Sequence, residues 1–194
     1  MKLPPGAHTS EPWRIHEVTS GFRVEDVWEL PTPGGPDDFP RLLEAFKAAD
    51  PMRNSSGLVR FLFDLRFKLG ELFGWDSPQK STSAPTLADL LSPELAQTTG
   101  PAFAEFNFLY MTADEYACEL ANKTVHAVMH LSWVRRGDGS YRGQMAVLVK
   151  PNGALGTAYM AAIKPFRYLV IYPAMLRAIG RAWALSEPRT ATSH

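Results

Sequence analysis

The sequence has little cysteine and no excess charge of either sign, and both shortages exclude functions. Cys118 is the only cysteine among 194 residues, so neither an intrachain disulfide nor a cysteine-based zinc site can form. Lys and Arg number 20, as do Asp and Glu, so the chain lacks the broad positive field that non-specific nucleic-acid binding requires. Because a single thiol suits a reducing compartment, we expect a cytoplasmic protein that does not bind nucleic acid.

Long apolar runs and the common catalytic motifs are also lacking. The first residues, MKLPPGAHTS, contain no apolar signal segment, and residues 158–184 are interrupted by Lys164, Arg167, Arg177 and Arg181. We therefore expect neither a signal peptide nor insertion into a membrane. No Gly-x-Ser-x-Gly, His-Glu-x-x-His or phosphate-binding loop occurs. The sequence thus points to no cofactor and no metal.

An apolar fraction of 45% is enough for a real core. We expect one domain over residues 13–185, after a flexible N-terminus (1–12) and before a polar tail (186–194). Two strands are expected at Trp13–Val18 and Phe22–Leu30. In the second, one face carries every other residue by the two-residue period of a strand, namely Phe22, Val24, Asp26, Trp28 and Leu30.

Two helices are expected next. The first begins after Asp37 or Asp38, has Pro40 in its first turn and ends at Pro51. The second follows Ser56 and ends at Gly74, with leucines and phenylalanines at helical spacing. Residues 76–101 then read as a long loop, either a lid or a tolerated insertion, with a short helix from Thr86 to Leu91.

From Phe103 onward the pattern predicts antiparallel strands. A hairpin turn at Asn122-Lys123 pairs Cys118 with Ala127. A second hairpin, turning at residues 136–140, pairs Trp133 with Gly143 and places apolar side chains on one face. A last short strand is expected at Thr157–Ala162.

A long helix is expected from Pro165, with a kink or break at Pro173. Its apolar stripe reads Phe166, Leu169, Val170, Pro173, Leu176, Gly180 and Trp183. The elements together predict an α+β fold in which a curved antiparallel sheet of about six strands grips this C-terminal helix.

Three stretches carry a resemblance: DEYACELANKTVHAVMHLSWV, YRGQMAVLVKPNG and IKPFRYLVIYPAMLRAIGRAW. They are similar to a bacterial family of unknown function in the START-like helix-grip superfamily (SRPBCC), which includes birch-pollen-allergen-like proteins and polyketide cyclases. The similarity covers about Trp13 to Trp183. It implies a cavity between the sheet and the C-terminal helix, but no catalytic motif and no cofactor.

Asp26 is the most informative acid, because its face of the strand is otherwise apolar and a buried carboxylate needs a partner. An edge strand or a bulge would let it reach solvent or a backbone N–H. Otherwise it is a cavity acid that, with Tyr116, binds or protonates a ligand. The expected inner face supplies a cavity wall, or else plain core: Trp28, Tyr110, Cys118, Met129, Trp133, Tyr141 and Met145, with Phe166 and Val170 from the helix.

His126 and His130 share the opposite face of their strand. The expected register sets Glu119 against His126 and Glu115 against His130, a set that a divalent metal accepts. Because that face should be in solvent, exposed Glu–His pairs are the simpler interpretation.

Three functions remain open. The first is a carrier or sensor for a small apolar or aromatic molecule. The second is a cofactor-independent cyclase, isomerase or lyase, and the third is a protein-interaction module with a filled core. Exposed strand edges also make a homodimer possible.

Overall fold

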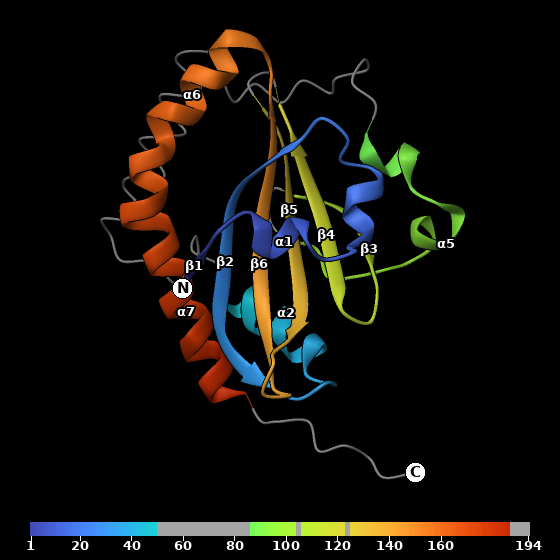
Figure 1. Cartoon of the computed structure of the whole chain (residues 1–194), viewed down its shortest axis with the longest axis vertical. Coiled ribbons are helices and arrows are strands. Elements are labelled where there is room, and N and C mark those ends of the chain that lie inside the picture. The colour runs from blue at the N-terminus through green and yellow to red at the C-terminus, as the bar shows by residue number, and fades with distance from the viewer. Residues whose placement is uncertain (50–85, 104–105, 123–124, 187–194) are drawn as a thin grey trace.

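The computed structural model describes residues 1–49, 86–103, 106–122 and 125–186 (Figure 1). Its elements in chain order are β1 (Lys2–Leu3), α1 (Gly6–Thr9), the 3₁₀ turn η1 (Arg14–Glu17), β2 (Arg23–Gly34), α2 (Phe39–Ala48), the 3₁₀ turn η2 (Leu87–Leu90), α5 (Pro93–Ala96), β3 (Asn107–Met111), β4 (Glu115–Ala121), β5 (Val125–Arg135), β6 (Tyr141–Pro151), α6 (Gly153–Phe166), the π-helical turn η3 (Arg167–Ile171) and α7 (Tyr172–Leu185). The expected helix between Ser56 and Gly74 lies outside the described residues. So do residues 76–85 of the expected loop 76–101 and the tail after Ser186.

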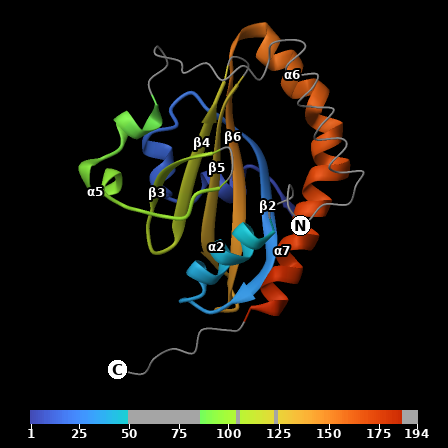
Figure 2. The same cartoon turned by 180° about the vertical axis from the view of Figure 1, so that it is seen from behind.

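The architecture confirms the expected α+β fold. Six antiparallel strands form one curved sheet in the order β1-β2-β6-β5-β4-β3. The long C-terminal helix runs beside β2, α1 lies on the face of the sheet nearer the viewer in Figure 1, and α2 lies on the face seen from behind in Figure 2. We call the face that carries α2 the inner face and the other the outer face. Within the described ranges, no helix is both long and apolar enough to span a bilayer.

The hairpin registers follow from the alternation of apolar residues. This alternation determines the face on which each side chain lies more reliably than it determines where the turn falls. Between β5 and β6 the predicted register is confirmed, with Trp133 opposite Gly143. Between β4 and β5 the pairing is moved by two residues, so that Cys118 faces Met129 instead of Ala127. Because the side-chain period of a strand is two, a shift of two leaves each residue on its expected face.

The chain before β2 differs from the expectation. Trp13–Val18 is not a strand: it contains η1, whose Ile15 is buried. Residues 1–12, expected to be flexible, contain β1 and α1, and His8 in α1 is completely buried. Contacts with the sheet, rather than a local pattern, order this segment. Its sequence has no strong helical or strand period, so the pattern did not reveal the structure.

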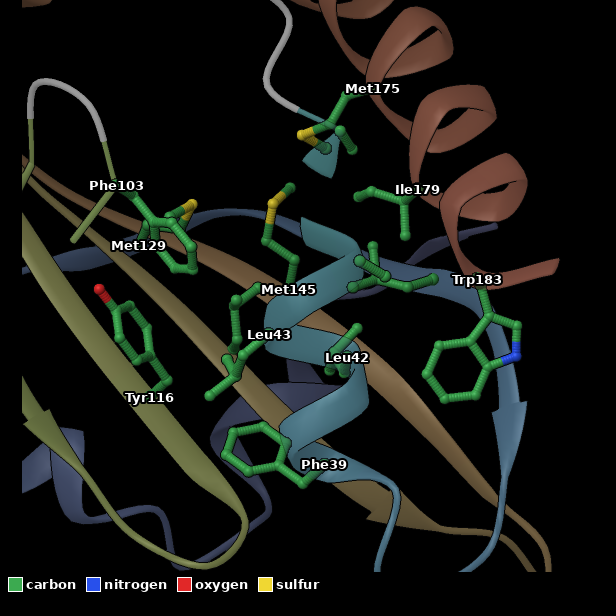
Figure 3. Close-up of a cluster of buried hydrophobic side chains, with 14 of the residues drawn as sticks. Phe39, Leu42, Leu43, Phe103, Tyr116, Met129, Met145, Met175, Ile179 and Trp183 are labelled. Atoms are coloured by element: carbon green, nitrogen blue, oxygen red, sulfur yellow. The ribbon is translucent and has the colours of Figure 1, made fainter. Parts of the chain in front are cut away.

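The helix α2 confirms its sequence signals. Asp38 occupies the N-cap position and Pro40 lies in the first turn. The Asp38 side chain accepts from Gly35 N at 2.9 Å, so it braces the preceding turn. Figure 3 shows α2 laying Phe39, Leu42 and Leu43 over the inner face, with Ile179 and Trp183 of α7 beside them.

The C-terminal helix begins earlier than expected. The predicted strand Thr157–Ala162 is wrong, since these residues lie in α6. Alanine is the strongest helix former and is frequent in this stretch, and this local preference outweighs the start signal at Pro165. The expected break near Pro173 takes the form of η3, where Tyr172 N donates to Arg167 O, a π-type bond. Proline lacks the N–H that would continue the regular helix, so the irregularity falls beside it.

Candidate functional site

Two rows of inner-face side chains cross four strands and bring most of the predicted site residues together. In one row Asp26 faces Val147, Val147 faces Met129, and Met129 faces Cys118. In the next, Trp28 faces Met145, which faces Leu131, which faces Tyr116. Trp133 lies on the same face and donates from Nε1 to Gly35 O at 2.9 Å. Apart from Asp26, the inner-face residues of these rows form one continuous apolar surface.

A β-bulge places Asp26 on this surface. The β2–β6 register shifts between Val24 and Asp26, so Val24 packs in the outer-face core, while Trp28 lies against the inner one. The expectation that Val24 and Asp26 share a face is therefore wrong. A bulge re-aims side chains, and bulges are frequent beside active sites.

The Asp26 carboxylate is completely buried and has three partners from the C-terminal helix. Tyr172 Oη donates to Oδ2 at 2.7 Å, and Tyr168 Oη donates to Oδ1 in a short hydrogen bond. Arg167 Nη2 lies 3.0 Å from Oδ2 and 3.1 Å from Glu25 Oε1. A buried carboxylate thus gains an opposite charge and two phenol donors, which offset its desolvation. The edge and solvent routes considered from the sequence are not used.

The helix supplies these partners where its own backbone is irregular. Arg167 and Tyr168 lie within η3, and Tyr172 is the residue that closes the π turn. A β-bulge and a π turn thus face each other across the same carboxylate. Both irregularities are enriched at functional sites.

Aromatic packing and unpaired donors complete the cluster. The Trp28 ring lies 4.9 Å from that of Tyr172 and 6.1 Å from that of Tyr168, centroid to centroid. Burial, followed by the Asp26 charge, raises the pKa of Tyr172 well above its usual range, so this phenol keeps its proton. Trp28 Nε1 and Arg167 Nε are buried and have no hydrogen-bond partner among the described residues.

One expected site residue, Tyr110, lies on the wrong face, and another, Tyr116, lies on the expected face but far from Asp26. Tyr110 lies in the outer-face core, because the β3–β4 register shifts between Phe108 and Tyr110. Tyr116 is on the inner face but lies three strands from Asp26, about 14 Å at the usual strand spacing, and donates to Pro101 O at 2.6 Å. The structure thus does not bring Asp26 and Tyr116 together as a catalytic pair.

Sequence reasoning missed Arg167, Tyr168 and Tyr172. The expected apolar stripe kept one helical period across the break expected at Pro173 and so placed Leu169 inward, whereas Leu169 is 77% exposed. The extra residue of a π turn rotates the helix face, and the buried residues after it are Tyr172, Met175, Ile179 and Trp183. A tyrosine pair four residues apart beside Pro173 was the available signal. Phe166 and Val170 are both partly buried.

The histidine and glutamate set lies largely out of solvent, in contrast to the exposed face expected: Glu115, Glu119 and His130 are buried and His126 is partly buried. His130 Nε2 lies 3.0 Å from Glu115 Oε2, and His126 Nε2 lies 2.7 Å from Glu119 Oε2. Neither pair is directly opposite, because Glu115 faces Ser132 in the shifted register. The His130 pair lies beneath Trp13 and His8, and Thr86 and Leu87 N donate to Glu119. No group of three or more His, Cys, Asp or Glu among the described residues could hold a metal.

A separate groove of about 620 Å³ lies between α2 and α7. Its lining is Glu44, Ala45, Ala48, Ala178, Arg181, Ala182, Leu185 and Ser186. It includes none of the Asp26 cluster.

Cys118 on the inner face is a buried, inert thiol. Burial raises the pKa of Cys118 well above its usual range, and its Sγ donates weakly to Met129 O at 3.8 Å. A thiol that keeps its proton is a poor nucleophile, so Cys118 serves as a small apolar side chain.

Comparisons with known proteins place the chain in a family without an assigned activity. No curated protein and no solved structure matches it. One family model matches residues 18–174, a range that contains the Asp26 cluster and the whole sheet except β1. Because this match covers more than half of the chain, the protein belongs to the family described as a protein of unknown function (DUF2867).

Proposed function

We propose that the protein binds a small apolar or aromatic molecule at the inner face, between the sheet and the C-terminal helix, as a carrier or sensor. The observation that carries the proposal is the buried Asp26 carboxylate, held by Tyr168, Tyr172 and Arg167 where a β-bulge meets a π turn. A fold rarely retains a buried ion pair for stability alone, since apolar residues of similar volume serve as well or better. The resemblance to the START-like superfamily supports the same location.

The unpaired donors define the polar end of the ligand. Trp28 Nε1 and Arg167 Nε are N–H groups, and both are buried without a partner among the described residues. A ligand oxygen that accepts a hydrogen bond, as in a carbonyl, phenol or carboxylate, would satisfy either donor. Met145, Met129 and Tyr116 extend from this end as an apolar wall suited to rings or alkyl chains.

A second function, as a cofactor-independent cyclase, isomerase or lyase, has one specific observation in its favour. Tyr172 Oη donates to Asp26 at 2.7 Å, and a carboxylate oriented by a hydrogen-bond donor is a common arrangement for a general base. In such an enzyme Asp26 would take the proton, and Tyr172, rather than Tyr116, would orient the carboxylate. We also infer a cytoplasmic location, because the one thiol is free and buried; a homodimer through the sheet edges stays a prediction.

The test is native mass spectrometry of the protein purified from its own host. We expect a co-purifying molecule with an aromatic or alkyl body and at least one acceptor oxygen, retained by the wild type and depleted in Asp26→Asn and Trp28→Phe. Tyr141→Phe is the matched control, because Tyr141 lies beside the inner-face core and has no part in the Asp26 cluster. A bound molecule that all three variants retain equally would place the site elsewhere, and conversion of that molecule by the wild type would favour the enzyme.

A further inference from the structure

The first nineteen residues form a strap over the outer face, which we call the N-terminal strap (Figure 1). Lys2 and Leu3 pair with β2 at one end. At the other end Trp13, Ile15 and Val18 are buried in the outer-face core. No strap residue belongs to the inner-face core. The strap does touch the Asp26 cluster at Lys2, whose Nζ donates to Tyr168 Oη at 2.7 Å, so release of β1 would break this contact.

Between these anchors the strap is joined to the sheet by a chain of buried hydrogen bonds. His8 Nε2 lies 3.1 Å from His130 Nδ1, and His130 Nε2 lies 3.0 Å from Glu115 Oε2. His8 and His130 are both completely buried. Glu115 also accepts from Tyr110 Oη at 2.8 Å and from Arg14 N at 3.0 Å. The chain therefore runs from α1 through β5 to β4.

The carboxylate fixes the direction of every bond in this chain. Glu115 only accepts, so His130 Nε2 carries a hydrogen and a neutral His130 offers Nδ1 as an acceptor. His8 must then donate from Nε2, which leaves its Nδ1 without a hydrogen. That Nδ1 atom is buried and has no hydrogen-bond partner among the described residues. A second proton on His8 would sit at a position with no acceptor and next to another imidazole.

The groups around the histidine pair do not remove this conflict. The titratable side chains that act on it, from η1, β4 and the turn before β4, are His16, Asp114 and Glu115. Tyr110 of β3 reaches it through Glu115, and Arg14 and Glu17 of η1 act on Tyr110. His16, whose ring centroid is 4.9 Å from that of His8, adds repulsion when it is protonated. Glu115 is separated from His8 by His130. Desolvation, then His130 and His16, lowers the pKa of His8 to about 3.

We propose that His8 and His130 form a latch through which acid pH loosens the N-terminal strap from the outer face. In the closed state His8 is neutral. In an open state the His8 imidazole is solvated and has its ordinary pKa of about 6.5. Below that pH the open state therefore binds a proton that the closed state does not bind. The closed state therefore loses stability as the pH falls below about 6.5, and the loss continues toward the closed-state pKa.

The size of the effect follows from these two pKa values. Between pH 7.5 and pH 5, protonation of His8 alone raises the opening equilibrium constant about 30-fold. The pKa of His130 is also lowered, chiefly by burial, so its exposure acts in the same direction. Trp13 and Ile15 still hold the strap by apolar burial, so opening becomes more frequent without becoming the dominant state.

Hydrogen exchange read by mass spectrometry on the full chain at pH 7.5, 6 and 5, corrected for the intrinsic pH dependence of exchange, tests the latch. We expect exchange of the strap amides to rise about 30-fold from pH 7.5 to 5, and at every pH the strap should exchange faster than β5 and β6, which need global unfolding. His8→Gln keeps an Nε2 donor for His130 but does not titrate, so most of the rise should be lost and only the contribution of His130 should remain. His16→Gln removes a neighbouring histidine outside the chain of bonds and should keep the rise.

Each other outcome overturns the latch. A strap that exchanges equally at pH 7.5 and 5, or one as strongly protected as β5 and β6 at pH 5, would mean that no local release occurs. An undiminished rise in His8→Gln, or loss of the rise in His16→Gln, would assign the proton to another group. Should His8→Gln fail to fold, the wild-type contrast between the strap and β5–β6 decides alone.

Discussion

Replacing Asp26 with Asn tests whether the buried cluster is a charged unit. The carboxylate accepts from Tyr168 and Tyr172 and pairs with Arg167 at 3.0 Å, and no part of it reaches solvent. An asparagine of the same size removes the charge and turns one acceptor into an N–H donor. That donor must then face a phenol or a guanidinium, each of which is also a donor.

The magnitude follows from the partners left behind. Breaking a buried ion pair and leaving one charge uncompensated costs about 3–5 kcal/mol. Arg167 keeps Glu25 at 3.1 Å, so we expect Asp26→Asn to lower the free energy of unfolding by about 3 kcal/mol, the lower end of that range. Tyr172→Phe removes one hydrogen bond to a charged group and should cost about 2 kcal/mol.

A double-mutant cycle separates their contact from other effects. If Tyr172 and Asp26 interact directly, the double variant should lose about 3.5 kcal/mol, less than the sum of the two single losses, since each single change already breaks the shared bond. Tyr141→Phe removes a phenol outside the cluster and should change the free energy of unfolding by less than about 0.5 kcal/mol. Urea unfolding followed by tryptophan fluorescence, with an unchanged slope, gives these values.

The reasoning would be refuted by additivity. If the two single losses summed in the double variant, Tyr172 and Asp26 would not share an interaction. An Asp26→Asn protein as stable as the wild type would show that the carboxylate's charge contributes nothing.

Three other changes follow from the packing and the charges. Gly143→Ala should lower the free energy of unfolding by about 2 kcal/mol, because an added Cβ would lie 2.8 Å from Thr32 Oγ1 and 2.9 Å from Leu42 Cδ2. Gly137→Ala is the control: an added Cβ there meets nothing within 4 Å, so this variant should be neutral in the same urea assay. Arg41→Met should lower the free energy of unfolding by about 2 kcal/mol. The reason is that Arg41 stacks 3.8 Å over the Trp183 ring and donates to Trp183 O and Ser186 O at the end of α7. A loss under about 0.5 kcal/mol would contradict that role. The pKa of His8 is lowered to about 3, so the free energy of unfolding should fall as the pH drops below about 6.5, by up to about 1.4 kcal/mol per pH unit. Urea midpoints at pH 7.5, 6 and 5 measure this fall. The fall should be shallower in His8→Gln.

Residue alternation and capping made much of the fold predictable. The β5–β6 register followed from placing every apolar partner on one face, and the start of α2 followed from Asp38 and Pro40. Even the displaced β4–β5 pairing left the faces intact. These features depend on local period and turn chemistry, which the sequence displays directly.

Three errors, at Val24, Tyr110 and Tyr172, share one physical cause, a single extra residue in a regular element. A bulge moved Val24 to the outer face, and another moved Tyr110 there. A π turn rotated the C-terminal helix and brought Tyr172 to Asp26. Such insertions depend on tertiary contacts, so no periodic pattern marks them, and in this protein they also build the candidate site.

The most direct test of small-molecule binding at the inner face is a methyl-labelled methionine NMR titration. Met129, Met145 and Met175 belong to the inner-face core, whereas Met1 is 70% exposed. The probes are naphthalene and biphenyl carboxylates and phenols, each with an apolar body and an acceptor oxygen. We predict saturable shifts of the three inner-face methyl groups, with Met1 unmoved and weaker binding in Trp28→Phe. Shifts confined to Met1, or no saturable shift with any probe, would contradict a binding site at the inner face.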